Sequence, residues 1–414
     1  MVAWRSEFLK VLHERGFVHQ CTDAETLDEL AAKQPITGYV GFDCTADSLH
    51  AGHLISIMML RWLQRTGHRP IALVGGGTTK VGDPSGKDEA RPLLSDAEIE
   101  RNKAGIRRNL ERFLDFERGA LLVDNAAWLD GLLYIPFLRE YGRHFTINRM
   151  LTFDSVRLRL EREQPLTFLE FNYMVMQAYD FLELWRRFGC RLQMGGSDQW
   201  GNIVCGIELT RRVEGVQLFG LTCRLLTTAS GAKMGKTAQG AVWLDPAKLS
   251  PFDYWQYWRN TEDRDVGRFL RLFTELPLSE IERLERLAGA ELNEAKKILA
   301  FEQTRLVHGE EEARRAAAAA QALFEGGGGD RAAIPVVEVP RTRFVQGIRV
   351  AELLRLAGLA PSNSEARRLI RGGGARLDGR RLEDEQLVLG PEFAEKEEIE
   401  LSAGRKRHVR VRVI

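Results

Sequence analysis

The sequence predicts an α/β protein that begins with a doubly wound parallel sheet and continues into a helical domain and a small α+β domain. Up to residue 249, short apolar runs that end at glycine or a polar residue alternate with amphipathic helical segments. This alternation is typical of parallel strands joined by crossover helices. Beyond Ser250 the apolar spacing becomes helical, and a glycine run at Glu325–Asp330 precedes the last part of the chain.

The composition is that of an ordinary globular protein. The chain has 414 residues, 44% of them hydrophobic and 28% charged, and this length suits two or three domains. The net charge of +1 gives no overall attraction to nucleic acid. No apolar run approaches the roughly 18 residues of a membrane span, and the first residues form a charged amphipathic helix rather than a signal peptide. We therefore expect a cytoplasmic protein without a membrane segment.

The cysteines also favour a reducing compartment. Their number is odd and no CxxC pair occurs, which argues against a disulfide framework and against a zinc site. The five are Cys21, Cys44, Cys190, Cys205 and Cys223.

The first strand and helix of the sheet are expected around residues 39–63, after two short helices in residues 5–35. The apolar run before Asp43 has the length of a buried strand, and residues 54–63 are apolar enough for a buried helix. A helix that follows a strand presents unpaired N–H groups and a positive dipole end, which favour an anion. His50 and His53 lie three apart at that entrance and can aim at one phosphate. The alternative is a pair of solvated or capping histidines.

The next elements follow in chain order. Residues 69–77 form an apolar run that ends in glycines, as a second parallel strand does at a ligand site. A polar loop with Asp83, Lys87 and Arg91 comes next, and Ser95 with Glu98 forms a capping box for a helix. A third strand is expected at 121–124, and 129–162 looks mostly helical.

A long helix with a polar face is expected after residue 167. Thr167 and Glu170 form its capping box, and Tyr173, Gln177 and Asp180 follow at spacings that place all three on one face. If this face is buried, Asp180 needs a hydrogen bond from a ligand, and that arrangement recognises a phenol. The alternatives are a solvated polar stripe, or an Asp180 paired with an arginine.

Two glycine turns and a basic loop complete the predicted site. The turns at Gly75 and Gly195, if they lie at the C-terminal ends of strands in one sheet, line one crevice, unless they are turn chemistry alone. The second turn leads into a helix that reaches about Arg212. The loop Lys233–Thr237, KMGKT, lacks the spacing of a Walker A loop. Together with HAGH at residues 50–53 it indicates electrostatic catalysis on a triphosphate, whereas alone it would be a solvated basic loop.

The domain boundaries are predicted from the changes in pattern. They give a sheet domain at 1–249, a helical domain at 250–325, a linker at 326–342 and a small domain at 343–414. A capping box is expected at Ser279 and Glu282. The last domain has 15 Lys and Arg against 11 Asp and Glu, so it is positive while the remainder is slightly negative.

In these motifs the chain resembles the bacterial tyrosyl-tRNA synthetases, which are class I enzymes. HAGH stands where that family has HIGH, KMGKT matches KMSKS, and GGSDQWGN with YxxxQAYD is characteristic of the tyrosine branch. The last two motifs argue against other nucleotidyl transferases and against the related tryptophan enzyme. Both histidines and both lysines are present, which argues against a retired scaffold that only binds RNA.

The resemblance implies a Rossmann-like catalytic domain that binds tyrosine and ATP. Tyr39 and Asp180 would contact the phenol, while Tyr173, Asp83 and Gln177 hold the amino group and Gln199 lies near the carboxylate. The implied catalytic set is Thr45, His50, His53, Lys87, Arg91, Lys233, Lys236 and Thr237. The implied ATP-binding set is Gly41, Asp43, His50, Gly52, His53, Gly196, Asp198 and Lys236. Ala51 in HAGH and Val40 near the ribose depart from the family pattern, and neither departure removes a catalytic group.

The resemblance also implies two reaction steps and a tRNA partner. Tyrosyl adenylate forms first, with Mg²⁺ as the counterion of ATP and with no metal or cofactor held by dedicated protein ligands. The tyrosyl group then passes to the 3′ end of tRNA(Tyr). The last domain resembles a small RNA-binding module, and its expected tRNA contacts are Arg367, Arg368, Arg371 and Arg376, whose alternative role is a solvated basic face. Family members are homodimers, and residues 129–150 are apolar enough to supply an interface.

Overall fold

A six-stranded sheet in the order β1-β6-β5-β2-β3-β4 forms the centre of the first part of the chain. Five strands are parallel, and β1 pairs antiparallel with β6 at one edge. The strands are β1 (Gln20–Cys21), β2 (Thr37–Asp43), β3 (Arg69–Gly75), β4 (Leu121–Asp124), β5 (Cys190–Gly196) and β6 (Phe219–Cys223). The predicted doubly wound parallel sheet is confirmed.

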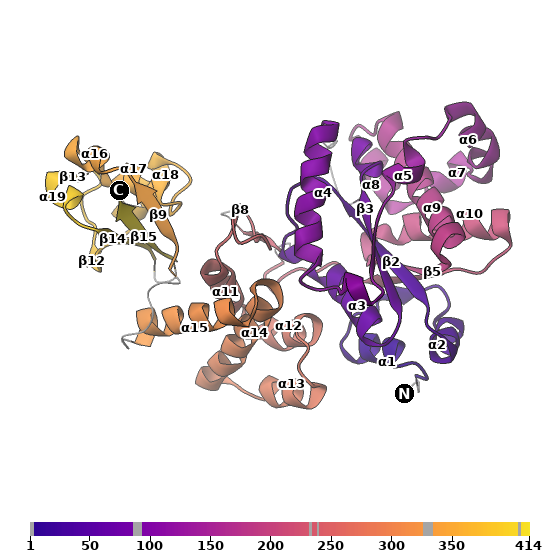
Figure 1. Ribbon diagram of the computed structural model, residues 1–414, viewed down its shortest axis with the longest axis horizontal. Helices are drawn as coiled ribbons and strands as arrows, with labels where there is room; N and C mark the ends of the chain where they lie inside the picture. Colours follow the sequence, from indigo (N-terminus) through magenta and orange to yellow (C-terminus); the bar gives the residue numbers. More distant parts are fainter. Residues whose placement is uncertain (1–3, 86–92, 232–233, 238–239, 326–333, 405–406) are drawn as a thin grey trace. The chain divides into compact units, whose positions relative to one another are not determined.

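Helices cover both faces of this sheet, as Figure 1 shows for α3 (Leu54–Arg65) and α4 (Asp96–Leu110) on one side and α9 (Phe168–Phe188) and α10 (Trp200–Glu214) on the other. Successive side chains along each strand point to opposite faces of the sheet. Tyr39 of β2 packs edge-on against Phe181 of α9, whereas Gly38 leaves room for Leu63 of α3, which a Cβ there would approach to 3.0 Å.

The capping residues fix where two of these helices begin. Ser95 accepts from the backbone N–H of Glu98 while the Glu98 side chain reaches back to Ser95, and Thr167 and Glu170 do the same for α9. Both predicted capping boxes are therefore confirmed. Between the two helices the chain forms short helical pieces rather than one long helix. They are α5 (Ala126–Leu129), α6 (Tyr134–Glu140), α7 (Ile147–Met150) and α8 (Asp154–Glu161).

The computed structural model describes residues 4–85, 93–231, 234–237, 240–325, 334–404 and 407–414. It divides into two compact units, and residues 262–287 belong with the sheet in the first unit. These residues carry α12 (Val266–Phe273) and α13 (Leu278–Glu285), while α1 (Glu7–Glu14) and α2 (Ala24–Lys33) precede the sheet. The units run across the predicted domain boundaries, which stay a prediction.

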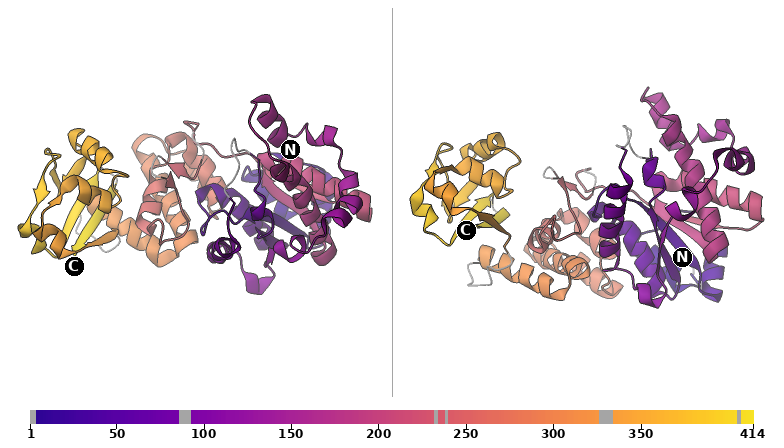
Figure 2. Two further views of the ribbon diagram at one scale, coloured as in Figure 1. Left: turned by 90° about the horizontal axis from the view of Figure 1, so that it is seen from above. Right: turned by 45° about the horizontal axis from the view of Figure 1, so that its top comes forward.

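The second unit contains a helical part and a small α+β part. The helical part has α11 (Pro251–Arg259), α14 (Leu292–His308) and α15 (Glu310–Glu325). The α+β part has a five-stranded sheet in the order β12-β11-β14-β15-β9, and Figure 2 shows its yellow strands with orange helices against them. Its strands are β9 (Val336–Val339), β11 (Ala375–Leu377), β12 (Arg380–Arg381), β14 (Glu398–Ala403) and β15 (Arg407–Val413), with β10 (Ile348–Arg349) and β13 (Val388–Leu389) paired separately. Its helices are α16 (Arg341–Val345), α17 (Val350–Leu356), α18 (Asn363–Arg371) and α19 (Pro391–Ala394).

The small α+β part has a hydrophobic core of its own. Phe344, Leu353, Ile370 and Leu401 are all buried in one cluster that its helices and strands share. In the described part of the chain, no helix is both long and apolar enough to cross a membrane.

Candidate active site

The strand order reverses direction at β2, which is where a parallel sheet binds its ligand. Pairing between β2 and β5 ends at Tyr39 and Gln193, although β2 continues to Asp43 and β5 to Gly196. Gly41 lies in the stretch of β2 that pairs with β3 but not with β5, and a Cβ there would meet no atom within 4 Å. The expected tyrosine and ATP residues of both strands therefore flank one switch point.

The predicted phenol site is a buried pair of polar side chains. Tyr39 is 1% exposed, and its hydroxyl has no hydrogen-bond partner among the described residues. Burial and the charge of Asp180 raise the pKa of Tyr39, so the hydroxyl keeps its proton. Burial raises the pKa of Asp180 to about 7, against the lowering effect of its hydrogen bonds.

Asp180 obtains its hydrogen bonds from two residues that the sequence reading missed. Trp128 donates from Nε1 to Oδ1 over 2.7 Å, and Asn125 donates from Nδ2 to Oδ2 over 2.9 Å. A ligand is therefore not required to satisfy Asp180, contrary to the expectation, although a carboxylate with two donors can still accept a further hydrogen bond. Among the described residues Asp180 has no arginine partner. Both donors follow β4 at its carboxyl end, and that position was the signal that could have identified them.

Asn125 also holds the first glycine turn. Its Oδ1 accepts from the backbone N–H of Gly77 at 2.8 Å, and its Nδ2 lies 3.0 Å from Oγ1 of Thr78. A Cβ on Gly75 would come within 2.3 Å of Oδ1 of Asp43, and one on Gly76 equally close to Asp124. Gly75 and Gly76 are therefore needed because side chains pack closely against them. For this first turn, turn conformation alone does not account for the glycines.

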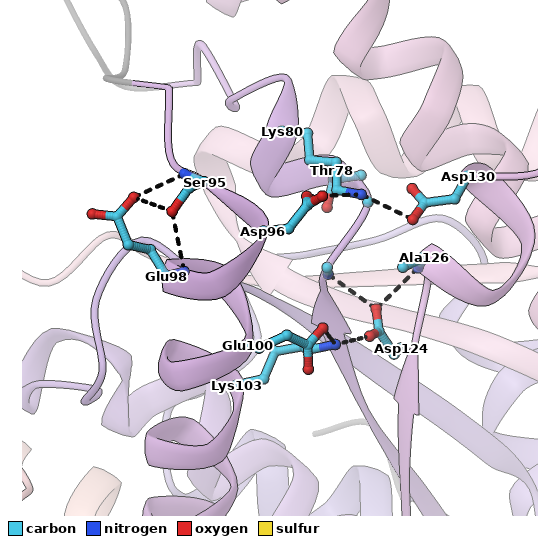
Figure 3. Close-up of polar contacts among 12 residues, drawn as sticks. Thr78, Lys80, Ser95, Asp96, Glu98, Glu100, Lys103, Asp124, Ala126 and Asp130 are labelled. Carbon is cyan, nitrogen blue, oxygen red and sulfur yellow. Dashed lines mark hydrogen bonds and ion pairs between the residues drawn. The ribbon is translucent and has the colours of Figure 1, made fainter.

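An ion pair supports the same turn from α4. Figure 3 shows Lys103 and Asp124 pointing toward one another, with Nζ and Oδ2 2.5 Å apart. Oδ1 of Asp124 accepts from the backbone N–H of Gly76 and of Ala126. A second lysine in the same view, Lys80, reaches Asp130 over 2.9 Å. Asp124, at the end of β4, thus connects α4 through Lys103 with the glycine turn through Gly76.

The residues expected at the amino group of tyrosine lie in two hydrogen-bonded groups, one with Tyr173 and Asp43 and one with Asp83, Gln177 and Gln199. Tyr173 donates from its hydroxyl to Oδ2 of Asp43 over 3.0 Å. Gln199 donates to Oδ2 of Asp83 over 2.9 Å, and Gln177 donates to Oε1 of Gln199 over 3.2 Å. A further amide, Asn202, donates to Oε1 of Gln177 over 2.9 Å and was missed. The structure therefore brings these predicted residues together from a strand, a loop and two helices.

The HAGH motif forms a short 3₁₀ turn, Ala51–His53, ahead of α3. Nδ1 of His50 accepts from the backbone N–H of Gly52 at 3.1 Å, and the two imidazole rings lie 4.1 Å apart. The histidines therefore do cap this turn, which was one of the two alternatives for them. Because Nδ1 accepts, the neutral His50 ring carries its proton on Nε2, which suits donation to a phosphate oxygen. Ala51 is fully buried, so this departure from HIGH concerns packing.

The KMGKT loop reaches this histidine turn. Met234 is buried, and Gly235 has φ +80°. A Cβ on Gly235 would lie 2.3 Å from the backbone nitrogen of Gly52 and 2.9 Å from Nδ1 of His50. The two motifs that lie far apart in sequence therefore meet. Lys87, Arg91 and Lys233 lie outside the described residues, as do the side chains of Lys236 and Thr237.

The residues expected at the ATP ribose lie at the end of β5. Gly196 precedes a 3₁₀ turn, Ser197–Gln199, and a Cβ on it would lie 2.6 Å from Oδ1 of Asp198. Burial, and then the charge of Asp83, raise the pKa of Asp198. Thr45, by contrast, is exposed on the loop after β2, and Val40 is buried.

The arginines expected to meet tRNA lie on α18 and the hairpin that follows it. Arg368 and Arg371 pair with Glu365 and Glu385 at 2.7 and 2.8 Å, while Arg376 donates to the carbonyl of Gly379. The hairpin turn has φ of 47° at Asp378 and 77° at Gly379, as a type I′ turn requires. Two further exposed arginines, Arg380 and Arg381, follow this turn. They were missed from the sequence, although two consecutive arginines directly after the Asp378–Gly379 turn were a visible signal.

Comparisons with known proteins identify the family of this chain. The family described as tRNA synthetases class I (W and Y) matches residues 31–325. A tyrosine–tRNA ligase from Rhodospirillum rubrum is 63% identical over 417 residues and 100% of each chain, and one from Xanthobacter autotrophicus is 62% identical over 98% of each chain. A truncated mitochondrial tyrosyl-tRNA synthetase structure from Aspergillus nidulans has a TM-score of 0.69 at 30% identity, over 77% of this chain and 94% of that chain.

The parallel sheet, its switch-point site and the family match define the class of protein: this chain belongs to the class I tRNA synthetases of the tryptophan and tyrosine family. Within that family it groups with the tyrosine–tRNA ligases, because relatives of that name are 62% and 63% identical along essentially the whole chain. The resemblance that the motifs indicated is thereby confirmed.

Proposed function

We propose that the switch-point site performs the first step of tyrosine–tRNA ligation, which is the activity of this chain. The carboxylate of tyrosine attacks the α-phosphorus of ATP, the bond to the leaving pyrophosphate breaks, and tyrosyl adenylate remains bound. The observation that carries the proposal is the buried hydroxyl of Tyr39, which has no protein partner in the described structure and lies beside the charge of Asp180. A phenol hydroxyl placed between them can accept from Tyr39 and donate to Asp180.

Selection of tyrosine over phenylalanine follows from these buried groups. Phenylalanine would leave the buried Tyr39 hydroxyl unpaired, and it would bring a hydrocarbon edge against the Asp180 carboxylate. An unpaired buried polar group costs about 1–3 kcal/mol. The site therefore discriminates by a missing hydrogen bond rather than by size.

The amino and carboxylate ends of tyrosine would meet the two hydrogen-bonded groups described above. Tyr173, Asp83 and Gln177 offer acceptors to an ammonium group, and Gln199 lies beside them near the carboxylate. Two carboxylates, Asp43 and Asp83, also make this end of the site favourable for a positive charge. Binding at both ends fixes the attacking oxygen relative to the phosphate, which is how positioning accelerates a reaction between two bound substrates.

The phosphates of ATP would lie at the histidine turn. The Nε2–H of His50 donates a hydrogen bond, the mouth of α3 and the lysines of KMGKT supply positive charge, and no side chain forms a covalent intermediate. Thr45, His53, Lys87, Arg91, Lys233, Lys236 and Thr237 complete the proposed catalytic set. Gly41, Gly52, Gly196 and Asp198 would face the nucleoside, and Mg²⁺ would arrive with ATP as its counterion.

The second step would use the positive C-terminal part. Arg367, Arg368, Arg371 and Arg376 lie on one helix and one strand beside it, and Arg380 and Arg381 extend the set. Contacts from such arginines to phosphates would position tRNA(Tyr) without reading its sequence. Its 3′ terminal ribose would then accept the tyrosyl group and release AMP.

A homodimer is supported by an apolar surface between α5 and α9. Of the large hydrophobic side chains that are exposed in the described residues, most fall in 133–169. They are Leu133, Tyr134, Ile135, Leu138, Ile147, Leu151, Leu158, Leu160, Phe168 and Leu169. An apolar concentration of this kind marks a protein interface, and it covers the segment that was expected to supply one.

We also propose that the protein works in the cytoplasm. All five cysteines are present as free thiols, which accords with a reducing compartment.

The two steps can be tested separately. ATP–pyrophosphate exchange is measured with tyrosine, phenylalanine or tryptophan, and we expect exchange with tyrosine far above the other two. Deleting residues 343–414 should leave that exchange intact and impair charging of tRNA(Tyr). Exchange with none of the three amino acids in a folded protein would contradict the first step, and equal loss of both activities on deletion would contradict the assigned role of the C-terminal part.

A further inference from the structure

The segment that leads into the KMGKT loop, here called the arm and represented by Thr227 and Ala229, is hydrogen bonded to the start of α12. The backbone N–H of Ala229 donates to Oδ2 of Asp265 over 2.7 Å. Arg268 donates from Nη2 to the carbonyl of Thr227 over 2.6 Å and to Oδ1 of Asp265 over 2.6 Å. Asp265 is 3% exposed, so its charge is buried against these partners. Side chains from the first turn of α12 thus bind backbone groups only a few residues before Lys233.

The opposite end of α12 is fastened to the helix that begins at the HAGH turn. Glu275, just beyond α12, accepts from Nε of Arg61 on α3 over 2.6 Å and also pairs with Arg65. Arg15 donates to the carbonyls of Thr274 and Leu276 over 2.9 and 2.6 Å. The helix α12 therefore joins the loop arm at one end to α3 at the other, and α3 carries the histidines at its mouth.

We infer that Asp265 and Arg268 are positioning residues for the adenylation step. They hold the arm of the loop, whose Met234 and Gly235 lie against the HAGH turn. The inference rests on the proposed role of KMGKT. Their hydrogen bonds go to Thr227, Ala229 and each other and not to a residue of the proposed site, so their effect passes through the loop.

The strength of the fastening follows from its chemistry. Asp265 accepts a backbone N–H with a charged oxygen in a buried position, and such a hydrogen bond is among the stronger ones in proteins. Removing the carboxylate leaves the N–H of Ala229 unpaired and takes away one of the two partners of Arg268, so of these bonds the arm keeps only the one from Arg268 to Thr227. A displacement of about 1 Å in a positioned catalytic group costs about 10²-fold in rate.

The first test compares rate with substrate affinity. We expect Asp265→Ala to lower kcat for ATP–pyrophosphate exchange about tenfold or more, while the Kd of tyrosine stays within about twofold of the unmodified protein. Asp265→Asn retains one acceptor for Ala229 and should restore part of the rate. The matched control is Glu280→Gln, which removes the carboxylate of an exposed ion pair with Arg283 on the neighbouring helix α13, and it should leave exchange unchanged. If Asp265→Ala changes tyrosine affinity and rate equally, the inference is wrong.

The decisive test is a double-mutant cycle with Lys233→Ala. If Asp265 acts through the loop lysine, Asp265→Ala should slow exchange by less than about twofold once Lys233 is already absent. An equal effect in both backgrounds would overturn the inference and leave the role of the loop standing. If Lys233→Ala alone has normal exchange, the proposed role of the loop fails instead, so the two failures are distinguishable. Should Asp265→Ala not fold, Arg268→Met is used in the same cycle, because this side chain is 43% exposed.

Discussion

Asn125 donates a hydrogen bond of 2.9 Å to Asp180, the carboxylate expected to read the substrate phenol, and the same side chain accepts from the backbone of Gly77. One amide therefore couples the glycine turn after β3 to the buried face of α9. We therefore expect the specificity of the site to depend on this turn, because the turn holds the amide that hydrogen bonds to the carboxylate.

Asn125→Ala should erode the preference for tyrosine over phenylalanine. The change leaves Oδ2 of Asp180 and the N–H of Gly77 without this partner, and each buried loss costs about 1–3 kcal/mol. We expect kcat/KM for tyrosine in pyrophosphate exchange to fall about tenfold or more. The control is Asn172→Ala, another amide on α9, which hydrogen bonds only to the carbonyl of Phe168 among the contacts found. An unchanged ratio of kcat/KM values in Asn125→Ala would show that Asn125 does not orient the carboxylate.

Tyrosine affinity should depend on pH near neutrality. Burial, with smaller contributions from Asp43 and Asp124, raises the pKa of Asp180 to about 7. The charged carboxylate accepts the phenol proton best, so affinity should rise with pH up to about 7 and then level off, with a slope of at most tenfold per pH unit below it. Equilibrium binding of tyrosine between pH 5.5 and 8.5 checks this. A profile of the same shape in Asp180→Asn would assign the titration to another group.

The raised pKa of Asp180 also fixes the sign of its effect on folding. The folded state binds the proton more tightly than the unfolded chain, in which the pKa is near 3.8. Between these values the free energy of unfolding therefore falls as pH rises, and the cost of the buried charge is fully present above about pH 7. Urea unfolding of the ligand-free protein at pH 5.5 and pH 8, compared with Asp180→Asn, measures this contribution. The variant should show the weaker pH dependence.

Gly235→Ala should slow adenylation without changing tyrosine affinity. The substitution places a Cβ against the backbone nitrogen of Gly52 and strains a residue at φ +80°. Gly231→Ala is a matched control, because Gly231 has φ +85° in the same loop but its Cβ would meet no atom within 4 Å. We expect kcat for exchange to fall at least about tenfold more in Gly235→Ala than in Gly231→Ala. Equal effects would mean that backbone strain, rather than contact with the HAGH turn, limits the loop.

Ile135→Asp should weaken self-association of the chain. Ile135 is 68% exposed within the apolar surface of residues 133–169, and a charge buried in an interface is costly unless it is paired. Analytical ultracentrifugation over a range of concentrations should show a larger dissociation constant than for Val388→Asp, an exposed apolar position in the C-terminal part. A monomer at all concentrations in the unmodified protein would contradict the homodimer.

The sequence alone predicted the local elements well, because each depends on residues that are close together in the chain. The capping boxes at Ser95 and Thr167 and the apolar runs of β2 to β5 are all local signals. The capping box at Ser279 was wrong. Helix α13 begins at Leu278, directly after Pro277, so Ser279 already lies inside the helix and cannot cap it.

The site was predicted as far as motifs reach. Tyr173, Gln177 and Asp180 were singled out by their spacing on one helix face, whereas Tyr39 came from the family resemblance alone. Their roles toward the substrate stay predictions. The hydrogen bonds of Asn125, Trp128 and Asn202 were missed, because each joins elements between 25 and 55 residues apart. The anchoring of the loop by Asp265 spans 36 residues and likewise appears only in the fold. Contacts of this range depend on how helices pack on the sheet, which periodicity does not specify.

The most direct test of the phenol site is Tyr39→Phe, measured as the ratio of kcat/KM for tyrosine to that for phenylalanine in ATP–pyrophosphate exchange. The hydroxyl has no partner in the described protein, so its removal should leave the free energy of unfolding unchanged or higher. We predict that the ratio falls about fivefold or more, because about 1 kcal/mol or more of hydrogen bonding to the phenol is lost. An unchanged ratio in a folded variant would contradict the assignment of Tyr39 to the substrate hydroxyl.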